Sequence, residues 1–324
     1  QKPDGTGQVN LSSLLSKLSA TVIVKVLSGR DRGGMSSNPN PVSDVVPKYF
    51  SVLMHRARCP IAYWKWPLLS SIVPSKAVTD EMDGFVEDLI TGLDDKEKVT
   101  LLAKLLEAED GDRLDHEELI GNIRTMLLAG TDTTSSTLAW AFYELSFRPD
   151  LQQLIAAEAQ ASVAFPDISS PADTESMKMA RAVWMECLRI HPPAPAISFT
   201  LAEPMELAGE MLPIGTHVML LLRYMATNSQ EMRTVLGEDT QVWRPERWLA
   251  DSGLLRVPVL DSLCYGHGAR ICIGRHLAEM EGVLTISEVC RRYKLAPCEY
   301  KVGQVDNFTS SPKPDVVLGV TPRS

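Results

Sequence analysis

Apolar residues recur at helical spacing along most of the chain, which predicts a mainly helical fold. Near the start, Leu14, Leu18, Val22 and Val26 recur in this way, and the turn-rich sequence GRDRGGMSSNPNP ends the helix. Residues 76–106 show more amphipathic helical pattern. The front of the chain is therefore expected to be helical.

The middle of the chain contains a long helix with a defined beginning. Asp115 and Glu118 have the D-x-x-E spacing of a capping box, and the apolar pattern after them predicts a helix over about 115–147. A further helix is predicted over 151–161. Another over about 175–190 should end at the sequence HPP, because proline cannot continue the hydrogen-bond ladder.

The last third combines short strands, irregular chain and one helix. Alternating apolar and polar residues, punctuated by Gly and Pro, predict hairpin strands over about 194–220. An irregular stretch over about 241–274 comes before a helix over about 273–293, and short strands follow. The predicted fold class is mainly α with small β-sheets, in a single partial domain over 1–324.

Composition narrows the classes of protein. The 324 residues include 32 basic and 41 acidic side chains, a formal charge of −9, which argues against a nucleic-acid binder. With 44% apolar residues the chain can bury a real core, and its six scattered cysteines do not form a disulfide framework. No uninterrupted apolar run reaches the roughly 18 residues of a spanning helix, so no transmembrane segment is expected.

The long helix contains the poor helix formers AGTDTTSST over residues 129–137. Hydroxyl groups here can bond back to carbonyls four residues earlier and deform the helix, and Gly130 would let a ligand approach the backbone. An acid beside an alcohol, Asp132 and Thr133, suggests a proton-delivery pair. A Ser/Thr-rich helix packed against a neighbour is the structural alternative.

Two further patterns carry candidate chemistry. Glu186 and Arg189 share a helix face among apolar neighbours, so they predict a buried ion pair to which Arg247 of the sequence WRPERW could add; a solvated surface pair is the alternative. The sequence YGHGARICIG places Cys272 just before a helix N-terminus and beside Arg270. Such a lone thiolate suits one axial bond to a haem iron better than a tetrahedral metal site.

Taken together and in this order, A-G-x-D-T-T, E-x-x-R, P-E-R and G-x-R-x-C-x-G resemble the motifs of the cytochrome P-450 haem-thiolate monooxygenases. The resemblance begins at about Asn10 and implies the cytochrome P-450 fold without its N-terminal sheet and first helices. It also implies that the cofactor is haem b, iron protoporphyrin IX.

The resemblance implies a role for each matching residue. Cys272 would be the thiolate ligand, Arg270 would pair with a haem propionate, Tyr265 would open the cysteine loop, and Gly268 and Gly274 would shape it. On the other face of the haem, Asp132 and Thr133 would handle protons and Gly130 would border the pocket. A buried network would hold the cysteine loop in place: Glu186, Arg189 and Arg247.

The implied activity is insertion of one oxygen atom from O2 into a small lipophilic substrate. Electrons would come from NADPH through a separate flavoprotein reductase or a ferredoxin, with no nucleic-acid partner. Two alternatives remain: a haem-thiolate isomerase or dehydratase of oxygenated lipids, and an inactive truncated member with an interaction role. The resemblance to microsomal members implies that the parent protein sits at the endoplasmic reticulum membrane, anchored only by upstream sequence.

Several positions depart from the family pattern. Tyr265 stands where Phe is usual, and its phenol needs a partner if it is buried; Cys264 precedes it where Pro is common. An Arg that often meets a propionate is replaced by Phe199-Thr200. Without the family's front third, the pocket is expected to lack one wall and to bind its cofactor weakly.

Overall fold

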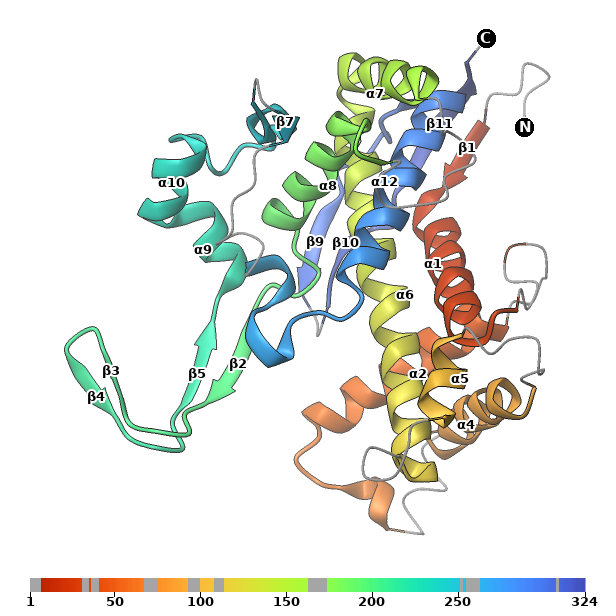
Figure 1. Cartoon of the computed structure of the whole chain (residues 1–324), viewed down its shortest axis with the longest axis vertical. Helices are drawn as coiled ribbons and strands as arrows, with labels where there is room; N and C mark the ends of the chain where they lie inside the picture. The colour runs from red at the N-terminus through yellow and green to blue at the C-terminus, as the bar shows by residue number, and fades with distance from the viewer. Residues whose placement is uncertain are drawn as a thin grey trace. The chain divides into compact units, whose positions relative to one another are not determined.

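The computed structural model describes residues 7–30, 35, 41–66, 75–92, 100–107, 114–162, 174–250, 253–254, 263–306 and 309–323. Helices dominate these residues, and the strands are short and belong to separate small sheets (Figure 1). The chain divides into two units: residues 12–135 make up unit 2, and residues 1–11 with 136–324 make up unit 1. Helix α6 (His116–Ser146) begins in unit 2 and ends in unit 1.

Helices form the frame of unit 2, joined by a short 3-10 turn. They are α1 (Leu11–Ser28), α2 (Pro41–Arg58), η1 (Tyr63–Lys65), α4 (Ser75–Thr91) and α5 (Leu101–Leu106). The sequence did not predict α2, because Pro47 inside it lacks the N–H that a helix interior uses. Its buried side chains Val45, Val46 and Tyr49 indicate that packing outweighs this local penalty.

The capping box at the start of α6 is present. The Glu118 backbone N–H donates to Asp115 Oδ1 at 2.8 Å, and the Asp115 N–H donates to Glu118 Oε2 at 2.9 Å. Two of the free N–H groups at this helix end therefore have partners, which explains why α6 begins at His116.

Gly130 of α6 lies against Ile23 of α1. A Cβ atom added at Gly130 would stand 2.8 Å from Ile23 Cγ1, closer than such atoms pack. The expectation that Gly130 leaves room for a ligand is therefore wrong for this face of the helix, because the space is filled by the neighbouring helix. The alternative of packing against a neighbour describes it better.

Unit 1 is built on three helices that pack together. Both α7 (Pro149–Ala161) and α8 (Lys178–Ile190) contact α12 (Arg275–Arg292), beside which they lie in Figure 1. The helices α9 (Leu222–Asn228) and α10 (Gln230–Leu236) follow α8 in the chain after the hairpins. The sequence did not predict them, because seven residues are too few to show helical periodicity.

The strands of unit 1 pair in antiparallel fashion. Strand β1 (Gly7–Asn10) pairs with β11 (Val317–Pro322), and β11 pairs with β8 (Tyr293–Ala296), which makes a three-stranded sheet in which Gly7 lies opposite Val320. The other strands form two-stranded ribbons: β2 (Ile197–Thr200) with β5 (His217–Leu220), β3 (Met205–Leu207) with β4 (Glu210–Leu212), β6 (Leu249–Ala250) with β7 (Gly253–Leu254), and β9 (Gly303–Asp306) with β10 (Ser310–Lys313).

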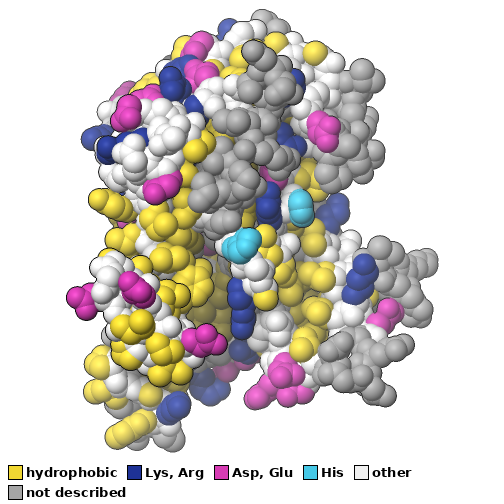
Figure 2. Space-filling view, turned by 60° about the vertical axis from the view of Figure 1, so that its left-hand side comes forward, with side chains coloured by type: hydrophobic (Ala, Val, Ile, Leu, Met, Phe, Trp, Pro, Cys, Tyr) yellow, Lys and Arg dark blue, Asp and Glu magenta, His cyan; other side chains and the backbone are white. Residues whose placement is uncertain are grey.

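Large hydrophobic side chains are exposed on the hairpins β2–β5. They include Ile197, Phe199, Leu207, Met211 and Met219. Figure 2 brings the side of the molecule that carries these hairpins forward and shows hydrophobic side chains gathered on this face. Phe199, which stands where the family often has a propionate-binding Arg, is one of these exposed side chains.

Among the described residues, α1 has the length and apolar composition of a membrane-crossing helix. The apolar pattern predicted a helix here but no transmembrane segment, because serines and Lys17 interrupt the apolar run. Length and composition do not separate a spanning helix from the core helix of a globular protein, and 44% of α1 is buried. The contact between Ile23 and Gly130 gives α1 the role of a packed helix of unit 2.

Replacing Gly130 by Ala should lower the free energy of unfolding by about 1–3 kcal/mol, because the new methyl group overpacks the contact with Ile23. Gly121→Ala on the same helix is the matched control. It has no heavy atom within 4 Å of the added Cβ and should raise stability by about 0.5–1 kcal/mol. Urea unfolding followed by circular dichroism measures both, and equal effects of the two variants would contradict the packing interpretation.

Candidate haem-thiolate site

The cysteine loop of unit 1 is a closed turn held by its own backbone. The Cys272 N–H donates to the Tyr265 carbonyl at 2.7 Å, and the Ile271 N–H donates to the Gly268 carbonyl at 3.2 Å. Gly266 and Gly268 have φ of +77° and +65°, left-handed values that favour glycine. These glycines let the chain turn back so that Cys272 stands beside the start of the loop.

Cys272 is the exposed one of the six cysteines. Cys187 and Cys290 are buried, and burial raises the pKa of both thiols, that of Cys290 to about 12. Buried thiols of this kind stay protonated and unreactive at neutral pH. The exposed Cys272 thiol is therefore accessible to a metal ion or cofactor.

Cys272 lies close in the chain to the start of α12. Gly274 caps α12, and its carbonyl accepts a hydrogen bond from the Ala278 N–H at 2.8 Å. Cys272 comes three residues before Arg275, the first residue of α12, so the positive end of the helix dipole lies close to the sulfur in the chain. A Cβ at Gly274 would lie 3.9 Å from the Cys272 Sγ, an ordinary van der Waals distance, so Gly274 is a direct neighbour of the sulfur.

The donor set and its neighbours fit a haem. Among the described residues, no group of three or more His, Cys, Asp or Glu side chains lies close enough together to hold a metal ion. A haem needs only one sulfur ligand from the protein. Ile273 beside Cys272 is 80% exposed, and Ile271 is also exposed. Arg270 is exposed in the 3-10 turn η5 (Gly268–Arg270). Exposed apolar side chains next to the Arg270 guanidinium suit a haem, which has an apolar ring and two propionate carboxylates.

The predicted E-x-x-R pair is fully buried. Glu186 and Arg189 have 0% exposed side chains, and their ion pair is bidentate, with Arg189 Nε and Nη2 donating at 2.9 and 2.7 Å. Arg247 Nε donates to Glu186 Oε1 at 3.1 Å, the Arg244 backbone N–H at 2.8 Å, and Trp248 Nε1 to Oε2 at 2.9 Å. The carboxylate thus accepts five hydrogen bonds, and the solvated alternative does not apply.

The other guanidinium N–H groups of Arg189 and Arg247 donate hydrogen bonds to backbone carbonyls of the segment 226–242. Arg189 donates to the carbonyls of Ala226, Thr240 and Val242, and Arg247 donates to those of Leu236, Asp239 and Val242. The hydrogen bond from Arg247 also lowers the pKa of the Asp239 carboxyl. Among the described contacts, these bonds hold residues 226–248 and do not reach the cysteine loop directly.

The cysteine loop has a different attachment to α8. Trp184 Nε1 donates to the phenol oxygen of Tyr265 at 2.9 Å, so the half-buried phenol does have the partner it needs. Burial raises the pKa of Tyr265. The sequence indicated that a partner was required, but no pattern in it could identify Trp184, which lies 81 positions earlier.

The acid–alcohol pair lies on the part of α6 that belongs to unit 2, whereas Cys272 belongs to unit 1. The expected back-bonding is present, since the Thr133 hydroxyl donates to the Ala129 carbonyl at 2.7 Å. Ser135 Oγ donates to the Asp132 carbonyl at 3.2 Å. Helix α6 is nevertheless unbroken through this segment, and the side chains of Asp132 and Thr133 are partly exposed.

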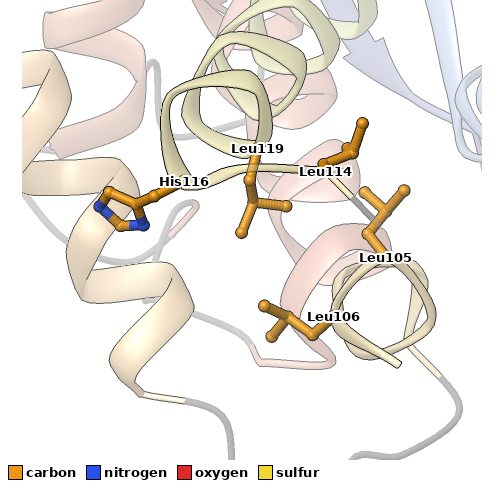
Figure 3. A pocket seen from close by; sticks show the side chains of 5 residues that line it. All are labelled: Leu105, Leu106, Leu114, His116 and Leu119. Carbon is orange, nitrogen blue, oxygen red and sulfur yellow. The ribbon is translucent and has the colours of Figure 1, made fainter. Parts of the chain in front are cut away.

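An apolar pocket of about 150 Å³ lies at the other end of α6 (Figure 3). Leucines of α5 and of the first turn of α6 line it, together with His116, whose Nε2 lies 2.7 Å from Glu87 Oε1. Asp132 follows His116 by 16 residues, about 24 Å along a helix. The pocket is therefore separate from the acid–alcohol pair.

A sequence model of the family described as "Cytochrome P450" matches residues 1–319. The chain belongs to the cytochrome P450 family. Membership implies a haem iron ligated by a cysteine thiolate, and it agrees with the mainly helical fold and small sheets.

Curated relatives of this P450 come from animals and bacteria. Cytochrome P450 27C1 of Aquarana catesbeiana is 33% identical over 216 residues, 66% of this chain and 39% of the relative. Cytochrome P450 BJ-4 homolog of Sinorhizobium fredii is 30% identical over 298 residues, 86% of this chain and 64% of the relative. The mitochondrial sterol 26-hydroxylase of Mus musculus is 34% identical over 188 residues, 56% and 34% of the two chains.

This P450 chain therefore spans between about a third and two thirds of the length of these relatives. Relatives named as mitochondrial give no support to the expected endoplasmic reticulum location.

Glu186→Gln should lower the free energy of unfolding by about 3–5 kcal/mol, because it leaves the buried charges of Arg189 and Arg247 without their carboxylate. Glu288→Gln is the matched control. Glu288 also pairs with an arginine three residues later, Arg291, but both side chains are 29% exposed, so the loss should stay within about 1 kcal/mol. Urea titration compares the two, and similar losses would show that burial of the Glu186 pair is unimportant.

Proposed function

We propose that this P450 is a haem-dependent monooxygenase whose iron ligand is Cys272. The observation that carries the proposal is the exposed thiol in a loop closed by its own backbone, immediately before α12. An exposed cysteine in such a loop is accessible to the iron of a bound haem. Family membership supplies the identity of the group that it ligates.

Other residues of unit 1 would place the cofactor. Arg270, which is exposed at the end of η5, would pair with a propionate, a charge-assisted interaction that favours a guanidinium. Gly268 makes the left-handed turn that shapes the loop, and Gly274 is a direct neighbour of the sulfur. Glu186, Arg189 and Arg247 would act structurally, by fixing α8 and the chain over 226–248.

Bound haem supplies the activation of O2, and the thiolate increases electron density at the iron. The residues of α6 would control protons: Asp132 exchanges them with solvent, and the Thr133 hydroxyl passes them on while its bond to the Ala129 carbonyl holds its rotamer.

The proposed reaction places one atom of O2 in a lipophilic substrate and releases the other as water. The names of relatives that are sterol 26-hydroxylases support a lipophilic substrate. Electrons would come from NADPH through a separate flavoprotein reductase or a ferredoxin. Incorporation of ¹⁸O from ¹⁸O2 into product distinguishes this reaction from an isomerase or dehydratase, which would incorporate none.

Cys272→Ala should abolish the thiolate-type Soret shift that the haem-loaded, reduced chain shows with carbon monoxide, because the sulfur ligand is gone. Cys298→Ala is the control: that thiol donates to the Tyr300 carbonyl outside the loop, and its loss should leave the spectrum unchanged. Absorption spectra after addition of haem, dithionite and carbon monoxide measure the effect. A wild-type chain that takes up no haem would contradict the proposal and favour an interaction role.

Thr133→Ala should lower product formed per NADPH consumed by about tenfold or more, since proton delivery loses its hydroxyl. Thr125→Ala is the matched control, because the Thr125 hydroxyl makes the same bond to a carbonyl four residues earlier, Gly121, at 2.8 Å on the same helix. Product and NADPH are quantified together with a reductase present. Equal coupling in the two variants would remove Thr133 from the mechanism.

A further inference from the structure

One residue links the cysteine loop to the interior of unit 1 through both its backbone and its side chain. The Tyr265 carbonyl accepts the Cys272 N–H at 2.7 Å, and the Tyr265 phenol oxygen accepts the Trp184 indole N–H at 2.9 Å. A continuous path of two hydrogen bonds and one residue therefore connects α8 to the backbone of Cys272.

The indole of Trp184, which donates the first of these two hydrogen bonds, is tightly packed. The Trp184 side chain is 1% exposed and lies against the bare backbone of Gly282 on α12, where an added Cβ would come within 2.2 Å of Trp184 Cε3. An indole packed this tightly between two helices has one available orientation. Its N–H is thus aimed at a fixed point, where the Tyr265 oxygen lies.

The tyrosine ring is held on a second side. The guanidinium carbon of Arg275 lies 5.4 Å from the ring centroid, within the range of a cation–π contact. Arg275 begins α12, three residues after Cys272, so this contact closes the loop from its other end. Burial keeps the phenol protonated, and the ring carries no charge that would oppose the arrangement.

We propose that Tyr265 is a positioning residue for Cys272. The hydrogen bond from Trp184 fixes the phenol, the phenol fixes the Tyr265 backbone, and the Tyr265 carbonyl fixes Cys272. The consequence for a haem ligand rests on the proposed function, whereas the placement of the loop does not. A phenylalanine at 265 would fill the same space but would leave the indole N–H of Trp184 without its acceptor.

Tyr265→Phe in the full chain tests this path without haem. Hydrogen exchange of a peptide that covers residues 266–274 should accelerate about fivefold, the effect of losing one ordinary hydrogen bond on local opening. Tyr300→Phe is the matched control: its hydroxyl donates to the Asp315 carbonyl at 2.6 Å, away from the loop, and its loss should leave exchange of this peptide unchanged. Unaltered exchange in Tyr265→Phe would overturn the proposal.

Trp184→Phe gives an independent check from the donor's side. It should also accelerate exchange of the loop peptide, and combining it with Tyr265→Phe should add no further acceleration, because both changes remove the same hydrogen bond. Fully additive effects would mean that the two side chains act separately, which contradicts the path.

The haem-loaded chain provides a spectroscopic readout. The thiolate-type carbon monoxide band of Tyr265→Phe should decay about fivefold faster on standing than those of wild type and Tyr300→Phe. Equal decay rates would show that the loop's placement does not affect the ligand. A wild-type chain without any thiolate-type band would refute the proposed function, while the exchange experiment would still decide the role of Tyr265.

Discussion

A single buried carboxylate constrains unit 1. Glu186 has no exposed surface, and an ion in such a place costs several kcal/mol unless other groups compensate it. Compensation comes from Arg189 on the same helix and from Arg247 and Trp248 beyond α10. Because the partners belong to separate parts of the chain, helix α8 and the irregular chain over 226–248 require each other in the folded state.

Helix α8 carries the buried ion pair on one side and Trp184, which contacts the cysteine loop, on the other. Trp184 precedes Glu186 by two positions, about 200° around a helix, so it reaches the opposite side from the carboxylate. On that side it contacts Gly282 of α12 and Tyr265 of the cysteine loop. Among the described contacts, α8 is the element that the ion-pair network and the attachment of the cysteine loop share.

Local features could be predicted from the sequence, and tertiary ones could not. The capping box at Asp115 and the back-bonding of Thr133 depend only on residues within four positions, so short patterns reveal them. The contacts of Trp184 with Tyr265 and of Ile23 with Gly130 join residues about 80 and 107 positions apart, which no periodicity connects. Helix α2 escaped prediction for a related reason: its tertiary packing outweighs the local effect of Pro47.

In the candidate site, too, the local features could be predicted from the sequence and the tertiary ones could not. Motif order identified the residue types around Cys272 and the E-x-x-R pair, but the surroundings that make Cys272 the exposed thiol and Cys187 a buried one emerge only in the folded chain. The motif singled out Cys272, and the difference in exposure between it and Cys187 is a tertiary property that the motif does not contain.

The small sheet has a consequence for how unit 1 assembles during synthesis. Strand β1 has its partner in β11, and the Asn10 side chain donates to the Asp315 carboxylate, 305 positions later, at 3.0 Å. A ribosome releases β1 long before β11 exists, so this edge must wait in an unpaired state while the helices form. The sheet can therefore be completed only after the C-terminal segment has been synthesised, and it joins the early and late segments of the chain.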